Sequence, residues 1–139
     1  MEGDAEEKKE RSLSTVLSRA PAGLAAPQVR VEVHLGAGLP AFIIVGLPET
    51  VVRESKERVR STILNSGFKF PDGRITVNLA PADLPKEGGR FDLPIALGIL
   101  VAQALQVAAI ASVAAERIGT AHVSEAIALR ALDRAQVEN

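Results

Sequence analysis

Three cations in the first half of the sequence have the spacing to form one anion-binding surface. Arg53, Lys56 and Arg60 follow each other at intervals of three and four residues, so on a helix they share one face. A stripe of this kind is typical of contacts with DNA phosphates. The alternative is a solvated helix face, because two arginines also lie four residues after glutamates and can form ion pairs along the helix. The pairs with this spacing are Glu49–Arg53 and Glu54–Arg58.

A second candidate anion site is a short glycine-containing loop with a cation on each side. Lys86 and Arg90 flank Gly88 and Gly89, just before an apolar stretch that predicts a helix. Backbone amides at the start of that helix, together with the two cations, could hold a phosphate of the DNA backbone. A structural interpretation stays open, in which the glycines allow a tight approach of loop to sheet and Asp92 caps the helix.

Other kinds of site find no support in the residue types. The chain has no cysteine, which excludes disulfides and thiolate metal sites and suits a reducing cytoplasm, where we expect the protein. His34 and His122 are far apart, so we predict no metal site. The four phenylalanines lie in or next to apolar segments, and we predict that they belong to the core rather than stack on bases. They are Phe42, Phe68, Phe70 and Phe91.

The composition is typical of one soluble globular domain with short appendages. Of 139 residues, 47% are hydrophobic and 24% charged, and a net charge of -1 leaves DNA binding to a local basic patch. Residues 1–11 are dense in both charge signs and predict a disordered tail, not a signal peptide. Leu93–Ala115 is uncharged and long enough to cross a bilayer, but polar residues, Pro94 and many alanines argue against a membrane span.

Strand and helix patterns indicate how the candidate residues are positioned. Val29–Leu35 alternates apolar and polar residues, as a half-buried strand does, and Ala41–Val45 is an apolar run that we expect beside it in a hairpin. Arg74–Leu79 alternates again and predicts a third strand. Between the second and third strands, residues 49–66 predict an amphipathic helix capped by Gly67. Its sheet-facing residues should be Val52, Ser55, Val59 and Ile63.

The last third of the chain predicts helices only. Phe91–Leu105 is apolar nearly all round, as expected of a helix buried between the sheet and neighbouring structure. Beyond Gln106 the sequence becomes rich in alanine and predicts two short helices, Val107–Glu116 and Ala121–Arg134, separated by a Gly-Thr pair.

Three ordered motifs carry a family resemblance. They are Val45-Gly46-Leu47-Pro48-Glu49-Thr50 with Glu54-Ser55, Asn65-Ser66-Gly67-Phe68 before Pro71, and Ile75 to Leu84 continuing through Pro85-Lys86-Glu87-Gly88-Gly89-Arg90-Phe91-Asp92-Leu93-Pro94. With them, Leu13 to about Leu100 resembles the amino-terminal domain of ComM-like, magnesium-chelatase-related AAA+ ATPases. The resemblance implies an α+β fold with the left-handed βαβ unit of the Lon proteolytic domain and the Lon-like domain of RadA.

The resemblance also predicts the organisation of the chain. Residues 12–105 would be the Lon-like domain, and 106–139 a short helical tail resembling the end of an AAA+ lid. Full-length members carry a nucleotide-binding module between these regions, with a Gly-x-x-x-x-Gly-Lys-Ser/Thr loop, and this sequence contains no such loop. The chain therefore looks like an internally deleted form, joined somewhere between Gln103 and Ala111.

The resemblance implies that full-length members use ATP and magnesium to drive DNA branch migration during natural transformation. Without the phosphate loop we expect no catalytic residue and no cofactor in this chain. The retained role would be DNA binding or assembly with full-length subunits. An interaction module or an inert remnant of a deleted gene is the alternative, and the expected partners include no membrane.

A Lon-like protease is disfavoured by the same alignment. Against Lon's Pro-Lys-Asp-Gly-Pro-Ser pattern, the segment Pro85-Lys86-Glu87-Gly88-Gly89-Arg90 places an arginine where the serine nucleophile would be. A guanidinium cannot attack a carbonyl, and no lysine follows Lys86 to act as the base.

Overall fold

The computed structural model describes the backbone of residues 13–118 and the burial of residues 13–115. The predicted tail over residues 1–11 and the predicted helix Ala121–Arg134 lie outside these residues. The chain divides into two compact units, Met1–Leu105 and Gln106–Asn139, and the sheet belongs to the first. The identity of these units as a Lon-like domain and a piece of an AAA+ lid stays a prediction.

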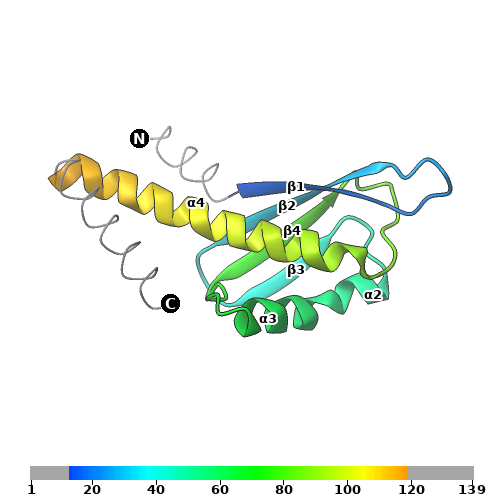
Figure 1. The fold of residues 1–139 in the computed structure, drawn as a ribbon, viewed down its shortest axis with the longest axis horizontal. Helices are drawn as coiled ribbons and strands as arrows, with labels where there is room; N and C mark the ends of the chain where they lie inside the picture. The colour runs from blue at the N-terminus through cyan, green and yellow to red at the C-terminus, as the bar shows by residue number, and fades with distance from the viewer. Residues whose placement is uncertain (1–12, 119–139) are drawn as a thin grey trace, which may run out of the picture. The chain divides into compact units, whose positions relative to one another are not determined.

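The first unit contains a four-stranded mixed sheet with the strand order β1-β2-β4-β3 (Figure 1). Its strands are β1 (Leu13–Arg19), β2 (Gln28–Gly36), β3 (Ala41–Val45) and β4 (Arg74–Ala80). β2 pairs antiparallel with both β1 and β4, whereas β3 pairs parallel with β4. The three predicted strands are therefore confirmed within a residue at each end, and β1 is an additional strand that the patterns did not reveal.

The predicted hairpin of β2 and β3 is wrong, because β4 lies between them. In the β2–β4 register, Val31 faces Leu79 and Val33 faces Val77, which places the apolar sides of two alternating strands on one face. β3 reaches β4 from the other side through the helical crossover that joins them. The hairpin was predicted because β2 and β3 are adjacent in sequence. The pairing is decided instead by burial of the matched apolar faces of β2 and β4.

The core lies between one face of the sheet and the helices. It joins the inward residues of β2 and β4 to apolar residues of α3 (Ser55–Asn65) and α4 (Asp92–Ile118). The predicted sheet-facing residues Val52, Ser55, Val59 and Ile63 are all buried, which confirms that prediction. Mixed α+β architecture is thus confirmed, with a parallel β3–helix–β4 unit, while its left-handed, Lon-like form stays a prediction.

The predicted helix over residues 49–66 consists of two parts, α2 (Thr50–Arg53) and α3, with Glu54 between them in helical conformation. The end of α3 is capped by Gly67, as predicted. The N–H of Phe68 donates to the carbonyl of Ile63, that of Gly67 donates to Leu64, and Gly67 has a positive φ of 80°. These bonds form a Schellman motif, which needs a left-handed residue at the position of Gly67.

α4 follows a 3-10 turn, η1 (Gly89–Phe91), and differs from its prediction in two ways. It continues without a break to Ile118, because the alanine-rich stretch after Gln106 has high helix propensity and no glycine or proline to end it. Its outer face is also exposed rather than buried: Leu93 is 66% exposed, and Leu97 and Val101 are exposed beside it. By length and composition alone Gly89–Ala115 could cross a membrane, a test that core helices of soluble proteins also pass.

Candidate nucleic-acid interface

The predicted stripe of cations runs along α2 and α3. Arg53 is the last residue of α2, and Lys56 and Arg60 follow on α3. Arg53 and Arg60 are exposed and Lys56 is half-buried. Since Glu54 keeps helical backbone angles between the two helices, the spacing that places the three side chains on one face is preserved.

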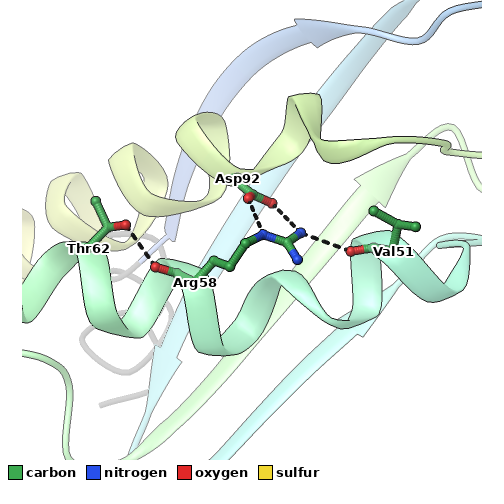
Figure 2. A network of polar contacts seen from close by, with 4 residues as sticks. All are labelled: Val51, Arg58, Thr62 and Asp92. Carbon is green, nitrogen blue, oxygen red and sulfur yellow. Dashed lines mark hydrogen bonds and ion pairs between the residues drawn. The ribbon is translucent and has the colours of Figure 1, made fainter.

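The ion pairs that would have neutralised this face do not form. Within residues 13–115, neither Glu49–Arg53 nor Glu54–Arg58 comes within ion-pair distance. Arg58 instead binds Asp92 at the start of α4, with Nε 2.6 Å from Oδ2 and Nη2 3.1 Å from Oδ1 (Figure 2). Its Nη2 also donates to the carbonyl of Val51 at 3.1 Å. In the structural alternative Asp92 would cap the helix, but it is the first residue of α4 itself, with helical backbone angles, and its carboxylate joins α3 to α4.

Arg58 is paired with Asp92, whereas the three cations of the stripe have no such partner among the described residues. The hydrogen bond from Arg58 to Asp92 raises the pKa of the guanidinium, and burial acts in the opposite direction. In the part of the chain whose side chains are described, Arg53, Lys56 and Arg60 have no carboxylate partner. Three cations without internal counterions on one helix face can be neutralised by phosphates.

An aromatic stack holds the last cation of the stripe in place. The guanidinium of Arg60 lies over the ring of Phe70, 5.2 Å from its centroid. That ring stacks in turn on Phe42 of β3, with 6.1 Å between centroids and 28° between planes. A cation over an aromatic face is attracted by the ring quadrupole, so Arg60 has a preferred position.

Lys86 does not belong to this surface, because its side chain is 0% exposed. Its ammonium donates to the carbonyl of Pro81, its N–H donates to Leu47 at 3.1 Å, and its carbonyl accepts from the N–H of Glu49 at 3.0 Å. Desolvation lowers its pKa, opposed in part by the charge of Asp83. Lys86 is therefore a buried residue that connects two loops. The sequence around a single lysine does not distinguish this buried role from a position on the surface.

The rest of the predicted anion loop stays on the surface beside α2. Arg90 is exposed in η1, which packs against α2. Gly88 has a positive φ of 78°, yet a Cβ at Gly88 or Gly89 would meet no atom within 4 Å. The proposed tight approach of these glycines to the sheet is therefore wrong.

Carboxylates near the same loop weaken its attraction for an anion. The pKa of Glu49 is raised by desolvation, and further by the charge of Glu87 and a hydrogen bond with it. Two acids in contact oppose the approach of a phosphate to Gly88 and Gly89. Of the predicted anion-binding residues, Arg53, Lys56, Arg60 and Arg90 therefore remain the candidates.

The aromatic residues divide between core and surface. Phe91 is fully buried, and Phe42 and Phe70 are partly buried against the core, as predicted. Phe68 is 54% exposed, so its assignment to the core is wrong. Phe68 follows Gly67, where the Schellman motif directs the chain away from α3. Composition alone did not reveal that the chain leaves the helix at this point.

The chain matches a protein family over most of its length and individual relatives over its amino-terminal part. The family model for subunit ChlI of Mg-chelatase matches residues 31–123. Competence protein ComM of Haemophilus influenzae is 65% identical over 91 residues, and uncharacterized protein YifB of Escherichia coli is 60% identical over 91 residues. An uncharacterized Mycobacterium tuberculosis protein is 39% identical over 92 residues. Each alignment covers 66% of this chain but 18% of the relative. The chain belongs to the family of the Mg-chelatase subunit ChlI, as a ComM-like member.

Proposed function

We propose that this chain is a non-catalytic amino-terminal part of a ComM-like protein and that it binds DNA through the positive face of α2 and α3. The main observation behind this proposal is that one helix face presents three cations with no carboxylate partner among the described residues. They are Arg53, Lys56 and Arg60. Because phosphates are bound by such cations with release of counterions, binding at this face is sensitive to salt.

Two further observations support this proposal. Arg60 is positioned by Phe70, which reduces the side-chain entropy lost when the guanidinium binds a phosphate. Arg90 is a further exposed cation, on η1, which packs against α2. The name of the relative ComM, a competence protein, is in keeping with a role in handling DNA.

We also propose that this chain does not hydrolyse ATP on its own. Its sequence has no Gly-x-x-x-x-Gly-Lys-Ser/Thr loop with which to hold nucleotide phosphates. ATP, magnesium and branch migration of DNA then belong to the longer members of the family. In this proposal the chain is a Lon-like βαβ domain that serves as a cytoplasmic binding module rather than a protease; the parallel pair of β3 and β4, joined through α2 and α3, supplies the βαβ unit.

Fluorescence anisotropy of labelled single-stranded and forked DNA, measured across a salt series, tests the DNA-binding proposal. Changing Arg53, Lys56 and Arg60 to alanine should weaken binding and lower the salt slope by about two, since each phosphate contact contributes roughly 0.7. The control removes three exposed cations from the uncovered face of the sheet, two of which have partners there: Arg30 pairs with Glu32, and Arg19 donates to the carbonyl of Ala26. It changes Arg19, Arg30 and Arg74 to alanine. Equal losses in both triple variants would reject the helix face as the interface.

Assembly with a longer family member is a second candidate, supported by the exposed apolar face of α4. Leu93, Leu97 and Val101 recur every four residues and are uncovered among the described residues. The curated relatives contain a large remainder, since the match covers 18% of their length, and this remainder is the proposed occupant. Mixing the chain with full-length ComM should change its ATPase activity, and Leu97→Glu should abolish that effect. No change with the unsubstituted chain would indicate an inert remnant.

A further inference from the structure

Phe68 exposes an aromatic ring just after the end of α3, the helix that carries Lys56 and Arg60. Its side chain is 54% exposed, although phenylalanine is normally buried in a domain of this size. The Schellman bonds from Phe68 and Gly67 to Ile63 and Leu64 fix the backbone at this point. The backbone that bears the Phe68 ring therefore has a fixed conformation.

Two cations belong to the same segment or contact it: Lys69 follows Phe68 directly, and Arg60 contacts Phe70. Lys69 follows directly, with a side chain 83% exposed, and its only ion pair within the described residues is a 4.0 Å contact with Asp72. Since both partners are almost fully solvated, that contact contributes little. Phe70 comes next, with the guanidinium of Arg60 over its face. The segment thus combines an open aromatic face with two cations.

We propose that the loop Gly67–Phe70 binds single-stranded DNA by stacking an unpaired base on Phe68. Lys69 and Arg60 hold the flanking phosphates, and the strand continues along Arg53 and Lys56 of the helix face. The inference rests on the proposed DNA binding and adds its substrate class. Aromatic faces bind bases of any sequence, but only bases whose faces are free. The loop therefore prefers single strands to duplex.

A structural role for Phe68 is the competing explanation. In a Schellman motif, the residue after the glycine often packs against the last turn of the helix, which here contains Ile63. If Phe68 has only a structural role, it contributes to stability, and another apolar side chain can replace it. A stacking ring must be aromatic, so substitution by leucine separates the two roles.

The test is 2-aminopurine fluorescence in a short single-stranded oligonucleotide titrated with the full chain, because stacking quenches this base. The protein has no tryptophan or tyrosine, so its own emission does not interfere. The unsubstituted chain should quench the probe and bind single strands more tightly than duplex. Phe68→Leu should remove the quenching and weaken binding roughly five- to hundredfold, whereas Phe68→Tyr should retain both.

Leu64→Ala is the matched control, since Leu64 is an exposed apolar residue of the same helix end and has no aromatic face. It should leave quenching and affinity unchanged. Equal quenching by the chain and its Phe68→Leu variant, or equal affinity for single strands and duplex, would overturn the inference while DNA binding stands. Failure of the unsubstituted chain to bind either DNA would overturn the proposed function as well. Thermal unfolding of each variant verifies that it is folded.

Discussion

The hydroxyl of Ser14 donates a hydrogen bond of 2.6 Å to the carbonyl oxygen of Gly98, which joins edge strand β1 to α4. The two residues are 84 positions apart in sequence, and the bond is buried. Gly98 also lies against Val33 of β2, so α4 approaches the sheet closely at this residue. The contact positions the helix whose first residue, Asp92, binds Arg58 of α3.

The buried hydroxyls of Ser14 and Ser55 should respond differently to removal. Ser14→Ala loses a buried hydrogen bond and should lower the free energy of unfolding by about 1 kcal/mol. The Oγ of Ser55 is buried and has no hydrogen-bond partner among the described residues. Ser55→Ala should therefore be neutral or stabilising by up to about 1 kcal/mol. Urea denaturation measures both, and a larger loss for Ser55→Ala would contradict the assignment.

Gly98→Ala should destabilise the domain by about 1–3 kcal/mol through overpacking. A Cβ at this position would lie 2.6 Å from Cγ2 of Val33, a short buried side chain with little freedom to move. Gly89→Ala is the control, because a Cβ there meets no atom within 4 Å. It should change the unfolding free energy by less than about 0.5 kcal/mol. Similar midpoints of thermal unfolding for the two variants would show that α4 and β2 are farther apart.

The Arg58–Asp92 pair should contribute a measurable but small coupling energy. Both side chains are partly exposed, so a double-mutant cycle with Arg58→Ala and Asp92→Ala should give a small favourable coupling. Salt should reduce this energy, since solvent ions reach the pair. The cycle is measured by chemical denaturation at low and high ionic strength. A coupling of zero at low salt would contradict an ion pair between α3 and α4 in solution.

Local patterns predicted the elements of this fold better than their pairing. Alternation along β2 and β4 depends only on which side chains meet the core, so their bounds followed from the sequence. β1 escaped notice because its inward positions include Ser14, whose polarity is satisfied by the distant Gly98. The position of β4 between β2 and β3 depends on a crossover of nearly thirty residues, which no short window of sequence describes.

The candidate site was predictable where it depends on helical spacing and not where it depends on tertiary contacts. Arg53, Lys56 and Arg60 share a face because of the helix period. The choice of Asp92 rather than Glu54 by Arg58 depends on how α4 meets α3. The burial of Lys86 and the exposure of Phe68 depend likewise on how loops leave their elements.

Lys86 should make the stability of the domain depend on alkaline pH. Desolvation lowers its folded pKa below the ordinary value of 10.5, so between the two pKa values the unfolded chain binds more protons. Unfolding free energy therefore rises with pH across that window, because deprotonation removes the cost of a buried charge. Lys86→Met keeps the length of the side chain without the charge and should abolish this rise.

Urea denaturation between pH 7 and about 10.5 measures the Lys86 contribution, with Lys69→Met as the control for an exposed lysine. Lys69→Met should keep the pH dependence of the unsubstituted chain. An unchanged pH dependence in Lys86→Met would place the ammonium in solvent and return Lys86 to the candidate DNA surface. The loss of its bond to Pro81 should also loosen the contact between the loops at Leu47 and Pro81. Faster amide exchange at Glu49 in Lys86→Met, with slow exchange kept in β2, would localise that loosening to the two loops.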